Sequence, residues 1–128
     1  MAHANSSGTY LYFDGDDVGA AIELRLLESD IDGASEISAR VSSSVQELSR
    51  QLESSLGATI VFAAGDEVLA RLTHEVDVAR VDTLRKQFLA ESGLTISCGI
   101  GRDPKQATLS LHVAKLRGKN RIQDLGDE

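Results

Sequence analysis

Acidic residues gather at two places where a predicted strand ends. Asp14, Asp16 and Asp17 follow the apolar and aromatic run TYLYF, and Asp66 and Glu67 stand in the short loop between two further apolar runs. Carboxylates that converge repel one another unless a cation neutralises them, and Mg²⁺ typically takes one or two carboxylates together with waters and substrate phosphates. The two groups therefore predict a divalent-metal site, provided that the fold brings them to the same edge of a sheet.

Simpler interpretations stay open for the same residues. Aspartate is favoured in turns and at helix N-termini, so the first group could be a strand-end turn that caps a helix, and Asp66 could be an ordinary hairpin residue. An EF-hand is excluded, because Val18 and Arg25 stand at loop positions five and twelve, where a calcium loop needs oxygen ligands.

A basic segment near the C-terminal end is the second feature with chemical potential. Lys115, Arg117, Lys119 and Arg121 fall within seven residues that contain no acid, in a chain whose formal net charge is −7. An acidic protein with one basic segment suits a small anionic ligand better than a long nucleic acid, which needs a broad basic surface. The alternative is a solvated helix end, where cations are favoured.

Length and composition limit the remaining classes. The chain has 128 residues, and we expect a flexible leader over 1–8, a single domain over 9–124 and a polar tail over 125–128. Its one cysteine, Cys98, excludes an internal disulfide and is expected in the core, and we expect a reducing, cytoplasmic environment. No apolar run approaches the roughly 20 residues that span a bilayer, so no membrane contact is expected.

The hydrophobic pattern predicts the elements that must position these residues. Strands are predicted over 9–13, 58–64, 68–72 and 94–101, with a short final strand in NRIQDL, and helices over 17–29, 34–56, 75–92 and 104–117. The uninterrupted apolar run at 58–64 predicts a strand covered on both faces. The order β-α-α-β-β-α-β-α predicts an α+β, ferredoxin-like fold with a mostly antiparallel sheet, in which the first strand lies beside the central hairpin and Asp14 approaches Asp66.

Together these motifs resemble the palm domains of nucleotide cyclases and polymerases. FDGDDVG and AAGDEVLA are similar to the two metal-binding motifs of that superfamily, LTISCGIG to a strand of GGDEF cyclases, and LHVAKLRGKNRI to their closing AK..GRNR segment. The similarity runs from about residue 9 to 122. The short chain and its DGDD motif resemble most the minimal CRISPR polymerase family, stand-alone palm domains associated with anti-phage defence.

The resemblance implies a metal site built from both acidic motifs. Asp14 corresponds to the first metal-binding aspartate, with the backbone carbonyl of Gly15 as its usual partner ligand. Asp66 corresponds to the second metal carboxylate, and Glu67 to a further ligand or an aid in deprotonating the attacking hydroxyl. Asp16 corresponds to the second acid of the first motif, and is either a metal-side residue or only the helix cap.

The same resemblance implies where a triphosphate would bind. Lys115 and Lys119 correspond to the two basic residues that hold the β- and γ-phosphates, for which an ammonium serves as a point charge. Gly65 lacks a Cβ and so permits the triphosphate to approach the hairpin backbone closely. Ala64 departs from the first glycine of the GGDEF signature, and the guanine-reading Asn-Asp pair of diguanylate cyclases has no match.

The activity that the resemblance implies is nucleotidyl transfer with Mg²⁺ or Mn²⁺ as cofactor. ATP would be converted into a cyclic di- or oligoadenylate with release of pyrophosphate, and this second messenger would act on a partner effector protein. Because one site holds one triphosphate, a homodimer is expected. Two alternatives stay open, namely a class III-like cyclase that makes cAMP, and a degenerate palm that binds nucleotide as a sensor.

Overall fold

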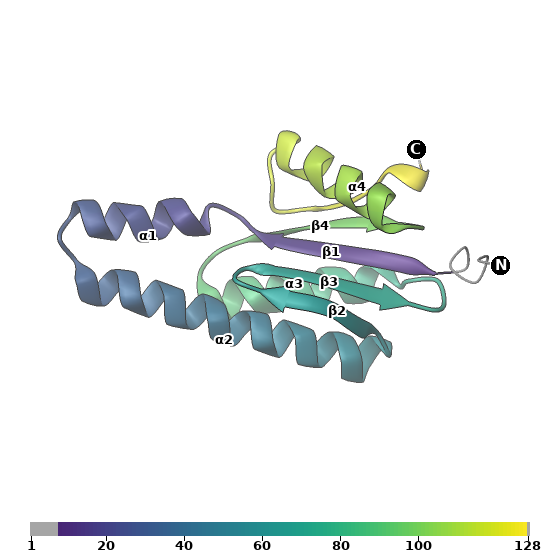
Figure 1. The fold of residues 1–128 in the computed structure, drawn as a ribbon, viewed down its shortest axis with the longest axis horizontal. Coiled ribbons are helices and arrows are strands. Elements are labelled where there is room, and N and C mark those ends of the chain that lie inside the picture. The colour runs from purple at the N-terminus through teal and green to yellow at the C-terminus, as the bar shows by residue number, and fades with distance from the viewer. Residues whose placement is uncertain (1–7, 128) are drawn as a thin grey trace.

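The computed structural model describes residues 8–127, so the predicted leader, apart from Gly8, lies outside the described residues. Over this range the chain forms a five-stranded sheet with four α-helices (Figure 1). The elements are β1 (Thr9–Gly15), α1 (Val18–Leu27), α2 (Ile31–Leu56), β2 (Thr59–Ala64), β3 (Glu67–Leu72), α3 (Val78–Ser92), β4 (Ile96–Gly101), α4 (Pro104–Leu116), β5 (Ile122–Asp124) and the 3₁₀ turn η2 (Leu125–Asp127).

The strand order is β2-β3-β1-β4-β5, which places β1 at the centre of the sheet. β1 is antiparallel to both β3 and β4, β2 and β3 form an antiparallel hairpin, and β4 and β5 are parallel. The α+β, ferredoxin-like palm and its mostly antiparallel sheet are therefore confirmed. The predicted neighbourhood of the first strand and the hairpin is confirmed as well, because Asp14 lies directly opposite Glu67.

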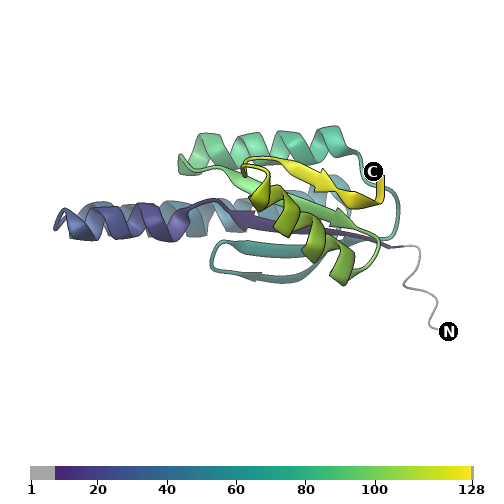
Figure 2. The same cartoon turned by 90° about the horizontal axis from the view of Figure 1, so that it is seen from above.

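Helices cover the sheet on both faces. α2 and α3 lie on one face and α4 on the other, as Figures 1 and 2 show. The main core fills the first interface, where Leu11 and Phe13 of β1 meet the apolar stripe of α2. Successive side chains of a strand point to opposite faces, so Tyr12 and Asp14 point toward α4. The chemically interesting residues of β1 thus lie on the α4 side of the sheet.

α4 packs directly against the backbone of β4. A Cβ added at Gly99 would lie 2.2 Å from the amide nitrogen of Leu111 and 2.3 Å from the carbonyl oxygen of Ala107, and one at Gly101 would lie 2.2 Å from the amide nitrogen of Ala107. Only glycine fits at either position, because these contacts are with backbone atoms that cannot rotate away. The two glycines thereby set the distance between α4 and the sheet.

α1 and the first turns of α2 form an arm that projects beyond the sheet (Figures 1 and 2). None of the ten residues of α1 is buried, and Leu24 and Leu27 have exposed fractions of 56% and 79%. α2 begins at Ile31, three residues before the predicted start, because the Asp30 carboxylate accepts a hydrogen bond from the Gly33 amide at 2.8 Å and caps the helix.

The prediction that β2 is covered on both faces is wrong. β2 is an edge strand, and most of its residues are exposed, including Val61 and Phe62. A continuous apolar run indicates a strand, but the run alone does not say whether neighbouring elements cover it.

Candidate active site

The fold brings the two acidic motifs to the same end of the strands, where β1 ends at Gly15 and β3 begins at Glu67, and this end of the sheet is called the acidic edge below. Asp14 and Glu67 form a cross-strand pair, and the Gly15 amide donates to the carbonyl oxygen of Asp66 at 3.0 Å. The Asp66 side chain lies against Gly15, since a Cβ added there would be 3.1 Å from Asp66 Oδ2 and 2.8 Å from Val18 Cγ2. Three predicted metal-binding residues, Asp14, Asp66 and Glu67, thus lie together where β1 meets the hairpin turn, with Asp66 against the buried Gly15 backbone.

The electrostatics of this edge favour a bound cation. Burial, followed by the negative charges of Asp14 and Glu67, raises the pKa of Asp66 above its usual value. Tyr12 donates from its hydroxyl to Glu67 Oε1 at 3.3 Å, and burial together with the same acids raises the pKa of Tyr12. A positive charge placed among these groups would relieve their mutual repulsion.

Lys115 reaches into the acidic edge from the last turn of α4. Its Nζ lies 3.2 Å from Asp14 Oδ2 and donates to the carbonyl oxygens of Asp14 and Gly15 at 3.1 and 3.0 Å. A cation is therefore attracted to the same oxygens that the sequence predicts as metal ligands. Lys119 lies in the following loop, where its ammonium pairs with the Asp17 carboxylate. Both lysines predicted to hold phosphate belong to this edge.

The oxygen donors fit Mg²⁺ or Mn²⁺. Among residues 8–127, no three His, Cys, Asp or Glu side chains are gathered into a ready-made metal cluster. Mg²⁺ does not need one, because it usually combines one or two carboxylates with carbonyl oxygens, waters and substrate phosphates. Asp14, the Gly15 carbonyl, Asp66 and Glu67 are residues of this kind, and their metal-binding role stays a prediction.

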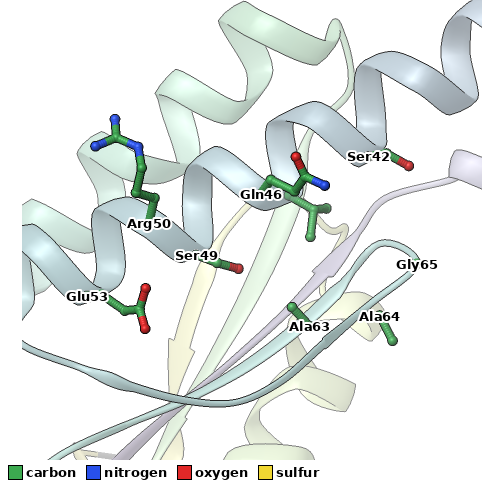
Figure 3. A pocket seen from close by; sticks show the side chains of 9 residues that line it. Ser42, Gln46, Ser49, Arg50, Glu53, Ala63, Ala64 and Gly65 are labelled. Carbon is green, nitrogen blue, oxygen red and sulfur yellow. The ribbon is translucent and has the colours of Figure 1, made fainter.

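Two grooves meet at the hairpin turn. One, of about 300 Å³, lies beside Asp66 between the arm and the hairpin, and its lining includes Val18, Ile22 and Ser42. The other, of about 350 Å³, runs between α2 and β2, as Figure 3 shows. Gly65 lines both grooves; it has a φ of +59°, and the space around its Cα is open. Glycine adopts a positive φ of this kind at no steric cost, because it has no Cβ.

Comparison with known proteins agrees with this geometry. Residues 10–125 match the family model of the minimal CRISPR polymerase domain. The chain belongs to the minimal CRISPR polymerase family. Its palm is of the type found in nucleotidyl cyclases and polymerases. No curated protein matches the chain.

Solved GGDEF domains share the fold of this minimal CRISPR polymerase domain. The GGDEF domain of DgcB from Caulobacter crescentus, in complex with c-di-GMP, superposes with a TM-score of 0.65 at 14% identity, over 91% of this chain and 77% of that one. The active GGEEF domain of a diguanylate cyclase from Vibrio cholerae gives 0.54 at 15% identity, over 91% and 81%. Diguanylate cyclase SiaD from Pseudomonas aeruginosa, in complex with its activator SiaC, gives 0.59 at 12% identity, over 96% and 52%.

One residue of this minimal CRISPR polymerase domain has a place that the sequence did not reveal. Asp16 is only 3% exposed, and it is not the helix cap that the sequence left open as an alternative. The N-cap position of α1 belongs to Asp17, whose side chain makes no capping hydrogen bond. Asp16 instead contacts Lys115 and two hydroxyl side chains of the β4 segment, Thr95 and Ser97. The sequence signal for this contact was the alternation of Thr95 and Ser97 in LTISCGIG, which places two hydroxyl groups on the same face of a strand.

The ionisation of Asp16 follows from these contacts. Burial by itself raises the pKa of a carboxyl group, but hydrogen bonds from Lys115, Thr95 and Ser97 outweigh it and hold the pKa of Asp16 below its usual value. Asp16 is thus an ionised, buried group.

Within the described part of the chain, no helix is long and apolar enough to cross a membrane.

Proposed function

We propose that this chain is a metal-dependent nucleotidyltransferase that converts ATP into a cyclic di- or oligoadenylate and releases pyrophosphate. The observation that carries the proposal is the convergence of Asp14, Asp66 and Lys115 at one sheet edge in a member of this family. Carboxylates there suit a divalent cation, and the lysine suits the triphosphate that the cation accompanies. For the adenine base and the cyclic product, the proposal relies on the resemblance to this family.

In each joining step, a ribose hydroxyl oxygen of one ATP forms a bond to the α-phosphorus of another, and in the closing step the free ribose hydroxyl of the linear product attacks that product's remaining α-phosphorus. The bond between the α-phosphorus and the bridging oxygen to the β-phosphate breaks, and pyrophosphate leaves with the electron pair. The Glu67 or Asp66 carboxylate accepts the hydroxyl proton. Lys115 and Lys119 bind the β- and γ-phosphates and hold the α-phosphate at the sheet edge.

A divalent ion held by Asp14, the Gly15 carbonyl, Asp66 and Glu67 would supply Lewis-acid stabilisation of the negative charge that develops on the phosphates. The groove beside Asp66 has a volume of about 300 Å³, which is large enough for a nucleobase. Ser38 and Ser42 of α2 line this groove and could hydrogen-bond the base through their hydroxyl groups. In this proposal the base of the bound ATP lies there, next to the hairpin.

One chain offers a single pair of candidate phosphate-binding lysines, so joining two ATP molecules into a ring calls for two sites that face one another. We therefore propose a homodimer as the active form. The product then serves as a second messenger in anti-phage defence and acts on a partner effector protein.

Incubation of the purified protein with ATP or GTP, each with Mg²⁺ or Mn²⁺, followed by mass spectrometry, tests this function. A cyclic di- or oligoadenylate is expected from the wild type and from Glu75→Ala, an exposed acid at the opposite end of the sheet. No product is expected from Asp14→Ala or Asp66→Ala. Cyclic AMP would contradict the joining of two nucleotides, and bound but unconverted ATP would indicate a sensor.

A further inference from the structure

Asp16 collects hydrogen bonds from three separate segments of the chain. Its Oδ1 accepts from Ser97 Oγ at 2.8 Å and from Lys115 Nζ at 2.7 Å. Its Oδ2 accepts from Thr95 Oγ1 at 2.7 Å and from the Asn120 amide at 2.9 Å. A carboxylate has about four lone-pair sites, so these four donors satisfy it fully. Asp16 therefore has no oxygen lone pair left for a metal ion, and the metal-side role that the resemblance allowed for it does not fit.

The segment that Asp16 holds through Asn120 is a strained loop. Gly118, Lys119 and Asn120 have φ angles of +114°, +65° and +50°, a region that non-glycine residues adopt only at a cost in free energy. Such a conformation persists only where surrounding contacts impose it. Here the Lys119 amide donates to the Ala114 carbonyl at 2.9 Å, and the Asn120 amide donates to Asp16.

Arg85 of α3 holds the same loop from its other side. Its side chain is only 10% exposed, and its Nη1 donates to Asn120 Oδ1 at 2.9 Å and to the Ile96 carbonyl at 3.1 Å. The Asp82 carboxylate accepts from the same guanidinium at 2.6 Å. The backbone of Asn120 is thus fixed by Asp16 and its side chain by Arg85. These two contacts restrict the backbone conformation of the preceding Lys119.

We propose that Asp16 is a positioning residue that sets both predicted phosphate-binding lysines as one unit, Lys115 by direct contact and Lys119 through the backbone of Asn120. The inference rests on the proposed function, because it assigns the lysines to a triphosphate. A carboxylate that only tied β1 to β4 would need Thr95 and Ser97 alone. The two further donors come from α4 and its following loop, which are the segments that carry the lysines.

Affinity for a non-cleavable substrate analogue tests this role without depending on turnover. The probe is α,β-methylene-ATP with Mg²⁺, titrated by calorimetry against the wild type and Asp16→Asn. The amide keeps the size of the side chain but turns one acceptor into a donor that faces donors. We expect about a tenfold loss of affinity, as is typical when a hydrogen bond to a charged group is lost.

A second background separates positioning from mere stability. In the Lys115→Met background the contact between Asp16 and Lys115 is already absent. The loss of affinity caused by Asp16→Asn is therefore expected to shrink to the few-fold part that acts through Lys119. Asp103→Asn is the matched control, because it makes the same chemical change at the far end of α4, where Asn caps the helix as well as Asp. It is expected to bind the analogue like the wild type.

The outcomes separate this inference from the function on which it rests. Wild-type binding that Asp16→Asn leaves unchanged, or a tenfold loss that persists undiminished in Lys115→Met, would overturn the positioning role alone. No binding by the wild type would overturn the proposed function and this role with it. Should Asp16→Asn not fold, Thr95→Val keeps the shape of that side chain, both lysines and the Asn120 amide, but removes one of the two hydrogen bonds that hold Asp16 Oδ2 in place. A few-fold loss of affinity is then expected, and an unchanged affinity would refute the role.

Discussion

Replacing Gly99 by alanine tests how closely α4 must lie on the sheet. The new methyl group would stand 2.2 Å from the Leu111 amide nitrogen and 2.3 Å from the Ala107 carbonyl oxygen. Ordinary contacts between such atoms are about 3.5 Å, so α4 must rise by about 1 Å or β4 must sink into the core. Overpacking of this kind costs about 3 kcal/mol, because neither backbone can rotate out of the way.

The same change acts on the candidate site through Lys115. Its ammonium is held 3.0 Å from the Gly15 carbonyl, and a displacement of α4 by about 1 Å breaks that arrangement. A misplacement of this size can lower turnover by about 100-fold. Urea unfolding followed by circular dichroism measures the first effect, and ATP turnover at saturating Mg²⁺ measures the second.

Gly19→Ala is the control for stability. It adds the same methyl group within α1, where the structure has no neighbouring atom within 4 Å. A gain of about 0.5–1 kcal/mol is expected, because glycine weakens a helix interior relative to alanine. The reasoning would be refuted if Gly99→Ala unfolded within about 0.5 kcal/mol of the wild type, the range of an ordinary surface substitution.

Three further changes have definite expected outcomes. Burial and neighbouring acids raise the pKa of Asp66, so Asp66→Asn is expected to raise the urea midpoint of the metal-free protein at pH 7. This gain in stability is expected to vanish below the usual carboxyl pKa of about 3.9, where the carboxyl group is protonated in the folded and the unfolded state. A lower urea midpoint at pH 7 would contradict this. Asp30→Ala removes the bond to the Gly33 amide and is expected to lower the free energy of unfolding by about 1 kcal/mol, whereas an unchanged midpoint would deny the cap. Cys98 is 0% exposed and burial raises its thiol pKa, so a thiol reagent is expected to label it only in concentrated urea.

Local patterns were sufficient to predict the order of the elements. The apolar stripe of the second helix was legible because Val41, Val45, Leu48 and Leu52 recur at helical spacing, and all four are buried. The hairpin followed from two apolar runs around a Gly-Asp loop. The predicted approach of the acidic motifs followed from the fold class, because a ferredoxin-like sheet places the first strand beside the central hairpin.

Features that depend on distant partners were harder to foresee. The exposed edge of β2 depends on what lies beside it in the sheet, and its own residues carry no such information. The sequence left Asp16 as either a metal-side residue or a helix cap, whereas its four hydrogen-bond donors come from residues 79 to 104 positions away along the sequence. The left-handed loop at 118–120 was likewise hidden, apart from Gly118 and an asparagine, the residue types that tolerate positive φ.

The arm formed by α1 and the first turns of α2 would couple ligand binding in the neighbouring groove to local folding. An isolated helix of ten residues is unstable in water, and none of the residues of α1 is buried. The helical structure of α1 therefore depends on its packing against α2. Val18 and Ile22 of this helix nevertheless line the groove beside Asp66. A ligand bound in that groove would spend part of its binding free energy on ordering the helix that it contacts. Hydrogen exchange in α1 is therefore expected to slow on binding, and a change that rigidifies the arm is expected to raise affinity without adding a contact.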